Sequence, residues 1–301
     1  MRVAAIDCGT NSIRLLVLSG SREAPVELVR EVRLARLGQG VDATGEFHPD
    51  ALARTFAVCE EYARIIRDHG AEKVRFVATS AARDVSNRQA LVDGVRERLG
   101  VEVDVIPGQE EARLSSAGAL CAVDVTPPTL ILDIGGGSTE LVLADGAGMI
   151  LHSVSLNVGS VRIRERFLHT DPPTPEEQRA SREFVGDLLD GSGIDFAAVA
   201  SAVGVAGTVT SVAARVLGLE AYSRDAVHGL VLGRDDIRAA NSHWLATPVS
   251  EIEGEPCMHP LRAGVIGAGT LILDQIAARI PSQKILVSET DILDGIALEL
   301  L

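Results

Sequence analysis

Two stretches of the chain share one pattern of apolar and polar positions. Each has an apolar run that ends in an Asp, then a glycine-containing turn, then a second apolar run. The first covers residues 3–18 around Asp7, and the second covers residues 129–144 around Asp133. Short apolar runs bounded by glycine and polar residues are typical of strands, and a glycine turn between two of them indicates a hairpin. The sequence therefore predicts two related strand–turn–strand units.

The segments that follow each hairpin alternate between extended and helical patterns. After the first hairpin we expect strands at 26–34, 74–79 and 101–106, and helices at 49–69, 87–99 and 108–122. After the second we expect strands at 150–158, 199–203 and 284–287, and helices at 161–168, 175–189, 207–217, 235–246, 262–280 and 292–301. Prolines at first-turn positions and glycines at helix ends support several of these limits. This alternation predicts an α/β fold.

The chain length of 301 residues suggests two domains. Residues 124–128 contain two prolines and little periodicity, which marks a boundary. We expect an N-terminal lobe at 1–124 and a C-terminal lobe at 125–301, with the final helix a candidate for packing back on the first lobe.

Each glycine turn is a candidate phosphate-binding loop. Glycine lets the backbone approach a ligand closely, and consecutive peptide N–H groups form an anion-binding nest. A third glycine turn, at 203–208, follows another apolar run. A single such turn could equally be an ordinary hairpin with a glycine bulge, but three of them favour two lobes with a cleft between them.

Composition narrows the class of protein. Apolar residues make up 46% of the chain and aromatic residues only 3%, so the cores should consist of small and branched aliphatic side chains. The four cysteines show no paired spacing. This argues against disulfides or a zinc site and favours a reducing, cytoplasmic location. Cys8 is expected to be a small apolar filler rather than a nucleophile.

The net charge of −14 argues against broad binding to nucleic acid or to anionic membranes. It also conflicts with a phosphate-rich substrate, unless cations gather locally or a metal neutralises the ligand. We see no signal peptide in the first residues, and residues 196–219 are interpreted as strand, turn and buried helix rather than a membrane span.

Five motifs together resemble a known family. They are residues 7–12 (DCGTNS), 79–83 (TSAAR), 108–113 (GQEEAR), 133–140 (DIGGGSTE) and 204–208 (GVAGT). The pattern resembles the exopolyphosphatase/guanosine pentaphosphate phosphohydrolase (Ppx/GppA) family, in its short two-domain form, and the resemblance covers essentially the whole chain. It implies two actin-like (ribonuclease H-like) lobes with mixed sheets flanked by helices and an interdomain cleft. It also implies Mg²⁺-dependent hydrolysis of a terminal phosphoanhydride by water, with Mn²⁺ as an alternative metal, and a homodimer.

The resemblance also implies roles for particular residues. Glu111 matches the carboxylate that positions or deprotonates water, and its neighbour Glu110 is the weaker candidate. Asp133 and Glu140 match the metal-associated acids. Asp7, at the equivalent place in the first hairpin, is a candidate for a third, water-bridged ligand. The basic residue facing the polyanion is Arg83, and the phosphate cradle comprises Gly9, Thr10, Asn11, Ser12, Gly135, Gly136, Gly137, Ser138, Thr139, Gly207 and Thr208.

Chemistry supports this assignment in part. Mg²⁺ binds through one or two carboxylates and takes substrate oxygens, which suits Asp133 and Glu140. Glu140 aligns with Arg14 in the first hairpin, so the two hairpins either perform different functions or Arg14 is a surface ion-pair partner. Arg162, Arg164 and Arg166 are two residues apart on a predicted helix, and a solvated position is the safer interpretation for them.

Four functions are compatible with the sequence. The first is an exopolyphosphatase acting on inorganic polyphosphate, and the second is a hydrolase of guanosine pentaphosphate. An ATP-dependent small-molecule kinase and a non-catalytic polyphosphate sensor are less favoured. The substrate is therefore expected to be a phosphate polymer or nucleotide, with no nucleic-acid or membrane partner.

Overall fold

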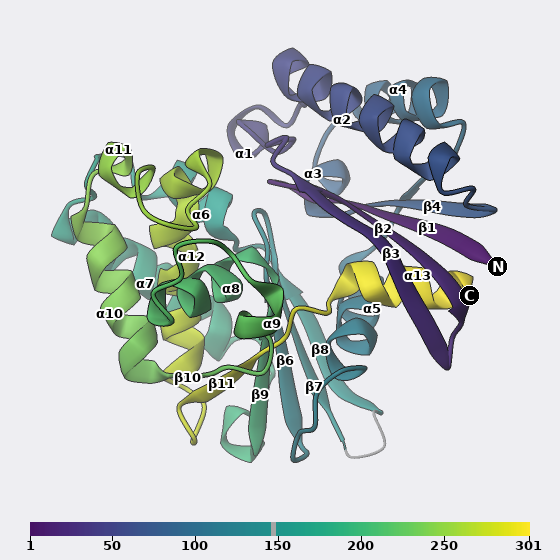
Figure 1. Ribbon diagram of the computed structural model, residues 1–301. Coiled ribbons are helices and arrows are strands. Elements are labelled where there is room, and N and C mark those ends of the chain that lie inside the picture. The colour runs from purple at the N-terminus through teal and green to yellow at the C-terminus, as the bar shows by residue number, and fades with distance from the viewer. Residues whose placement is uncertain (146–148) are drawn as a thin grey trace. The chain divides into compact units, whose positions relative to one another are not determined.

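A computed structural model describes residues 1–145 and 149–301, and it contains two mixed β-sheets flanked by helices (Figure 1). The first sheet has the order β3-β2-β1-β4-β5. Its strands are β1 (Arg2–Cys8), β2 (Ile13–Ser21), β3 (Ala24–Arg33), β4 (Lys73–Ala78) and β5 (Val103–Val105). The helices of this part are α1 (Val41–Thr44), α2 (Pro49–Asp68), α3 (Ser80–Arg83), α4 (Arg88–Leu99), α5 (Gly108–Leu120) and the last helix of the chain, α13 (Ile292–Leu300).

The second sheet has the order β10-β11-β9-β6-β7-β8. Its strands are β6 (Thr129–Ile134), β7 (Thr139–Ala144), β8 (Ile150–Leu156), β9 (Ser201–Val205), β10 (Val231–Gly233) and β11 (Lys284–Val287). Its helices are α6 (Ser160–Arg166), α7 (Pro175–Asp190), the 3₁₀ turn η1 (Phe196–Ala198), α8 (Ala206–Val216), α9 (Arg224–Val227), α10 (Arg234–Ala246), α11 (Val249–Ile252) and α12 (Pro260–Ala277). The predicted α/β class, with mixed sheets flanked by helices, is confirmed.

The two predicted hairpins are built alike. In each sheet the first strand of the hairpin is antiparallel to the second and parallel to a later strand, so β1 pairs with β2 and β4, and β6 pairs with β7 and β9. The turns close in the same way: the Gly9 N–H donates to the Ser12 carbonyl at 2.9 Å, and the Gly135 N–H donates to the Ser138 carbonyl at 3.0 Å. The internal repeat seen in the sequence is therefore a structural repeat.

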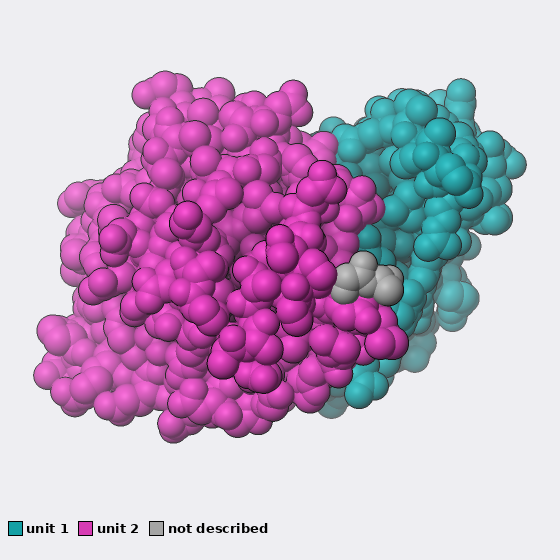
Figure 2. Space-filling model, turned by 90° about the horizontal axis from the view of Figure 1, so that it is seen from below, with its two compact units in different colours: residues 1–118, 291–301 teal, residues 119–290 magenta. Residues whose placement is uncertain are grey.

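The chain divides into two compact units, which Figure 2 colours separately. Unit 1 comprises residues 1–118 and 291–301, and unit 2 comprises residues 119–290. The last helix, α13, thus lies in unit 1, where it packs on β1, β2 and β4. The lobes at 1–124 and 125–301 and the cleft between them stay predictions.

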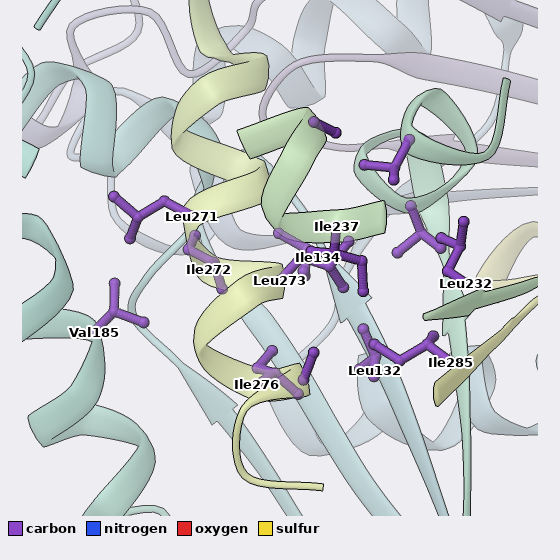
Figure 3. Packing of buried hydrophobic residues seen from close by; sticks show 14 of the residues in the cluster. Leu132, Ile134, Val185, Leu232, Ile237, Leu271, Ile272, Leu273, Ile276 and Ile285 are labelled. Atoms are coloured by element: carbon purple, nitrogen blue, oxygen red, sulfur yellow. The ribbon is translucent and has the colours of Figure 1, made fainter. Parts of the chain in front are cut away.

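Each unit has its own aliphatic core. In unit 2, α12 packs against α6, α7, α8 and α10, and Figure 3 shows Leu271, Ile272 and Ile276 of this helix among residues such as Val185 and Leu132. In unit 1, one face of the sheet is covered by α2 and α4, and the other by α5 and α13. Because both faces are covered, β1 is buried from its second residue onward.

Some predicted limits differ from the structure. The strand expected at 199–203 is Ser201–Val205, because η1 precedes it, and the helix expected at 262–280 begins earlier, at Pro260, and ends at Ala277. The short strand β10 and the four-residue helices were not predicted, since such short segments carry no measurable periodicity. No helix within the described residues is long and apolar enough to cross a membrane.

Candidate active site

Two buried carboxylates face each other across the central hairpin of unit 2. Asp133 on β6 lies directly opposite Glu140 on β7, and their exposed fractions are 7% and 2%. Glu140 also accepts a hydrogen bond of 2.6 Å from the Ser155 hydroxyl on β8. Like charges directly opposite one another on paired strands are destabilising on their own. The pair is therefore suited to a cation between or beside the two carboxylates.

The glycine turn that joins these strands presents its peptide N–H groups away from α6. The start of α6 takes up the loop carbonyls: the Ser160 and Val161 N–H groups donate to Gly135 and Gly136 at 2.9 and 2.8 Å. The Arg162 Nε donates to the Gly137 carbonyl at 2.9 Å. In a trans peptide the C=O and N–H point in opposite directions. The next three N–H groups, of Gly136, Gly137 and Ser138, therefore point away from α6, as an anion-binding nest requires.

The turn of the first hairpin is held in the same manner. The Gly38 N–H donates to the Thr10 carbonyl at 2.8 Å, and the Arg36 N–H donates to the Asn11 carbonyl at 2.9 Å. By the same trans-peptide argument, the N–H groups of Asn11 and Ser12 point away from the segment that supports the turn. Both predicted phosphate loops thus have their carbonyls occupied by protein.

The third glycine turn is the start of α8. Ala206 adopts a left-handed conformation with φ of 65°, and Gly207 and Thr208 lie in the first turn of the helix. A Cβ at residue 207 would lie 2.7 Å from Nη2 of Arg262, so the glycine lets this guanidinium approach the turn closely. The Arg262 guanidinium also donates to Ser211 at 3.0 Å, so a cation lies against this turn. Arg262 could not be predicted from the sequence, because its contact joins two separate helices, α8 and α12.

Glu111 is buried in unit 1, with an exposed fraction of 8%, in the first turn of α5. The Arg83 Nη1 donates to its Oε2 at 2.6 Å and to the Ile106 carbonyl at 3.1 Å. Glu110, by contrast, pairs with Arg113 at the surface at 2.7 Å, which lowers its pKa. The choice of Glu111 over Glu110 as the catalytic carboxylate stays a prediction. The structure shows a contact that the sequence did not suggest, namely the guanidinium of Arg83 holding Glu111.

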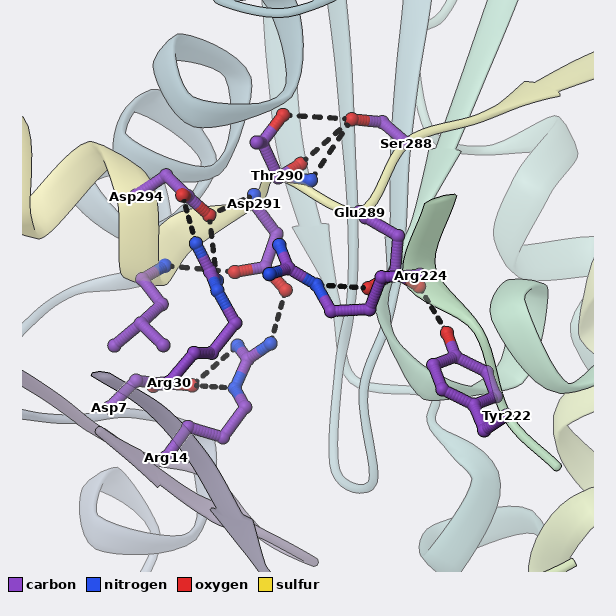
Figure 4. A network of polar contacts seen from close by, with 11 residues as sticks. Asp7, Arg14, Arg30, Tyr222, Arg224, Ser288, Glu289, Thr290, Asp291 and Asp294 are labelled. Atoms are coloured by element: carbon purple, nitrogen blue, oxygen red, sulfur yellow. Dashed lines mark hydrogen bonds and ion pairs between the residues drawn. The ribbon is translucent and has the colours of Figure 1, made fainter. Parts of the chain in front are cut away.

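Asp7 and Arg14 form an ion pair inside unit 1 (Figure 4). Arg14 donates from Nε and Nη2 to Oδ2 of Asp7 at 3.0 and 2.6 Å, and from Nη1 to Asp291. Burial raises the pKa of Asp7, against the opposing effect of Arg14. The side chain of Arg14 is only 16% exposed, so this is not a surface pair. In unit 1 the cross-strand pair is satisfied by opposite charges, whereas in unit 2 the equivalent pair consists of two acids.

The expectations for the arginines of α6 and for Cys8 can also be compared with the structure. We expected solvated positions for Arg162 and Arg164, but both side chains bind backbone carbonyls. Arg162 donates to Gly137, and Arg164 donates to Leu168 and Thr170. Cys8 is buried at the end of β1, and burial raises the pKa of its thiol well above the usual value. A thiolate nucleophile at this position is therefore disfavoured.

Asp133 and Glu140 could hold a divalent metal ion, but the protein supplies only part of its ligands. Among the described residues no group of three or more His, Cys, Asp or Glu side chains is placed to hold a metal ion. Mg²⁺ is commonly held by one or two carboxylates, with waters and substrate oxygens completing its shell. Asp133 and Glu140 suit that sparse ligation, and residues of unit 1 are not needed to complete it.

Comparison with known proteins agrees with this arrangement. Residues 17–301 match the model of the Ppx/GppA phosphatase family. The chain belongs to the Ppx/GppA phosphatase family. It is 41% identical to a Mycobacterium tuberculosis protein named exopolyphosphatase 2, over 99% of this chain and 98% of that protein.

Solved structures of Ppx/GppA proteins share the fold. A crystal structure described as an exopolyphosphatase-like protein has 38% identity and a TM-score of 0.95, and the alignment covers 100% of this chain and 98% of that one. The Aquifex aeolicus family member has 29% identity and a TM-score of 0.84, with 100% and 97% covered. The family assignment made from the five motifs is thus confirmed over nearly the whole chain.

Proposed function

We propose that this chain is an exopolyphosphatase, which hydrolyses the terminal phosphoanhydride of inorganic polyphosphate and releases orthophosphate. The observation that carries the proposal is the central hairpin of unit 2. There, a nest of peptide N–H groups follows directly on one of two buried, facing carboxylates, Asp133 and Glu140. The similarity to a protein named exopolyphosphatase 2 supports the same substrate.

We propose Asp133 and Glu140 as the residues that hold a divalent metal, Mg²⁺ or Mn²⁺. When bound, the ion supplies positive charge that offsets the charge of the phosphate oxygens. The third candidate, Asp7, stays a prediction; the structure shows its Oδ2 accepting two bonds from Arg14.

The chain's own residues bind phosphate and activate water. The N–H groups of residues 136–138 and the hydroxyls of Ser138 and Thr208 bind phosphate oxygens, and the N–H groups of Asn11 and Ser12 do so in unit 1. The Thr139 hydroxyl, which we expected in the phosphate cradle, is buried and donates to the Val158 carbonyl at 2.6 Å. Glu111, which Arg83 holds at Oε2, orients the attacking water and accepts its proton. The new P–O bond forms to the water oxygen, and the anhydride P–O bond breaks, leaving the shortened chain.

The test compares two neighbouring glutamates. Phosphate release from polyphosphate is measured with Mg²⁺ for the wild type, Glu111→Gln and Glu110→Gln. We expect Glu111→Gln to lower kcat by about 10²–10⁴-fold, and Glu110→Gln to stay near wild type because it lies at the surface. Equal rates for all three proteins would sink the assignment of Glu111, and no release by the wild type would sink the function.

Guanosine pentaphosphate is the second candidate substrate, and one residue favours it. Tyr222 is 44% exposed, its hydroxyl donates to Glu289 (Figure 4), and it lies near Thr210 of α8. A fixed, exposed ring next to a phosphate loop could stack a base. Rates on both substrates, for wild type and Tyr222→Leu, separate the two: a selective loss on the nucleotide favours the second function.

Location and assembly are also proposals. All four cysteines are free thiols, which suits a reducing cytoplasm. A homodimer follows from family resemblance, and analytical ultracentrifugation at several protein concentrations measures it directly.

A further inference from the structure

Arg36 lies in the segment that supports the first phosphate loop. Its N–H donates to the Asn11 carbonyl at 2.9 Å, and two residues later the Gly38 N–H donates to Thr10 at 2.8 Å. From the other side, Arg54 of α2 donates to the Ala35 carbonyl at 2.8 Å. Hydrogen bonds to the first phosphate loop and to α2 therefore hold the backbone around Arg36 in place.

The conformation of Arg36 is unfavourable for an arginine. Its φ is 51°, in the left-handed region that Gly and Asn adopt far more readily than a long side chain. Backbone hydrogen bonds explain why the segment has this shape, but they do not explain why the residue is arginine. Glycine or asparagine would make the same backbone bonds with less strain.

Within residues 1–145 and 149–301, the side chain of Arg36 has no hydrogen-bond acceptor. Its Nε is buried, and among the described residues neither a hydrogen bond nor an ion pair to its guanidinium is found. The contrast with nearby arginines is clear, since Arg14, Arg30 and Arg33 each pair with carboxylates. A buried donor without an acceptor costs free energy unless a ligand or water supplies one.

A second orphan atom lies in the same loop. The side-chain Oδ1 of Asn11 is buried and also lacks a partner within the described part of the chain. A carboxamide presents either its oxygen or its NH₂ at a given point after a half-turn about its last bond. Asn11 and Arg36, joined by a backbone hydrogen bond, thus bring two polar side-chain groups with unmet hydrogen bonds to the first hairpin turn.

We propose that Arg36, with the side chain of Asn11, forms a subsite for a chain phosphate of the substrate, separate from the phosphate that is cleaved. The inference rests on the proposed function for the identity of the polyanion. A guanidinium is well suited to such a group, because it donates two parallel hydrogen bonds to phosphate oxygens. The subsite contributes binding to substrate and transition state alike, so its loss raises KM rather than lowering kcat.

Three variants test the subsite. Arg36→Asn removes the charge but suits the left-handed backbone, Arg36→Lys keeps the charge but loses the fork, and Arg96→Ala removes a surface charge that is paired with Glu102. We expect KM for long-chain polyphosphate to rise about 10–100-fold in Arg36→Asn and less in Arg36→Lys, with kcat nearly unchanged. Arg96→Ala should match wild type. The melting temperature of Arg36→Asn should equal or exceed that of wild type, because strain is relieved.

The kinetics and the melting temperature of Arg36→Asn can also overturn the proposal. An unchanged KM in Arg36→Asn, or a lowered melting temperature with unaltered kinetics, means that water satisfies Nε and the residue is structural. Orthophosphate and guanosine pentaphosphate serve as competitors: inhibition weakened by the variant only for the nucleotide reassigns the subsite to a nucleoside polyphosphate.

A binding experiment separates this inference from the proposed function. Polyphosphate of defined length is titrated calorimetrically into Glu111→Gln and into the double variant that also carries Arg36→Asn. If wild type releases no phosphate but binding weakens 10–100-fold in the double variant, the function fails and the subsite stands. If wild type is active and both variants bind alike, the subsite fails and the function stands.

Discussion

Arg83 and Glu111 are joined by an ion pair of 2.6 Å between side chains that are 22% and 10% exposed. A charge-assisted hydrogen bond between largely buried side chains holds the carboxylate in one orientation, as the positioning of a water molecule requires. Arg83 also donates to the Ile106 carbonyl, so its guanidinium has a fixed position. We therefore propose Arg83 as a positioning residue for Glu111, and the polyanion contact that the sequence suggested stays a prediction.

Arg83→Met tests this assignment. Without the guanidinium, Glu111 is no longer held in its orientation, and kcat should fall by about 10–100-fold while KM stays near wild type. Arg83→Lys should restore part of kcat, because it restores a donor to the carboxylate. Phosphate release measured over a range of polyphosphate concentrations gives both constants. A raised KM with an unchanged kcat would return Arg83 to the role of substrate contact.

Sequence reasoning identified residues whose neighbours are close along the chain. Asp133 and Glu140 are opposite each other because a hairpin fixes their register, and the shared pattern around Asp7 predicted the same geometry there. Arg262 and Arg36 were missed. Arg262 matters because it contacts a separate helix, and Arg36 matters because its side chain finds no acceptor among the described residues. Neither property produces a recognisable pattern in the sequence.

At the scale of elements, α5 and α13 cross with their backbones in contact. A Cβ on Gly118 would lie 1.8 Å from the Asp291 carbonyl oxygen, and one on Gly295 would lie 2.1 Å from the Leu114 carbonyl oxygen. Since α5 also carries Glu111, this crossing fixes the helix on which the candidate base is placed. The sequence predicted both helices, but not that two glycines allow them to touch.

Gly118→Ala should destabilise the protein by about 3 kcal/mol, because backbone atoms cannot move aside as a flexible side chain can. The matched control is Gly264→Ala on α12, where a Cβ meets nothing within 4 Å. That change should raise stability by about 0.5–1 kcal/mol, as expected for alanine in a helix. Urea unfolding measures both, and similar values for the two variants would contradict the close crossing.

Glu177, in the first turn of α7, should make the stability of the protein depend on pH. Glu177 accepts bonds from the N–H groups of His169, Thr170 and Thr174 at 3.0, 3.1 and 2.8 Å, and from the Thr170 hydroxyl. The hydroxyl bond is the main cause that lowers the pKa of Glu177 to about 2 from 4.5. An acid with a lowered folded-state pKa contributes stability that is full above its unfolded pKa and is lost as the pH falls.

Glu177→Gln should therefore lower the melting temperature at pH 7 and flatten its decline between about pH 4.5 and pH 2. Glu176→Gln, at the neighbouring exposed position, is the control and should leave the decline as in wild type. Scanning calorimetry across this range is the measurement. An equally steep decline in Glu177→Gln would show that other carboxylates determine the acid sensitivity.

At the scale of the whole molecule, a net charge of −14 must be reconciled with a polyanionic substrate. Local features resolve the conflict only at short range: peptide N–H groups of the loops, and guanidinium groups beside them such as that of Arg262 at Gly207. At longer range the summed field still repels the substrate. Because the two effects act over different distances, salt should separate them.

We expect kcat/KM for polyphosphate to rise and then fall as salt is added at constant free Mg²⁺. The Debye length shortens from about 30 Å at 0.01 M to about 8 Å at 0.15 M, so the long-range repulsion is screened first. Above that concentration the screening reaches the short contacts, and affinity declines. The control replaces two exposed acids, Glu97 and Glu102, with glutamine, which should reduce the initial rise without changing kcat. A steady decline from the lowest salt onward would instead mean that the local cations dominate the approach of the substrate at every distance.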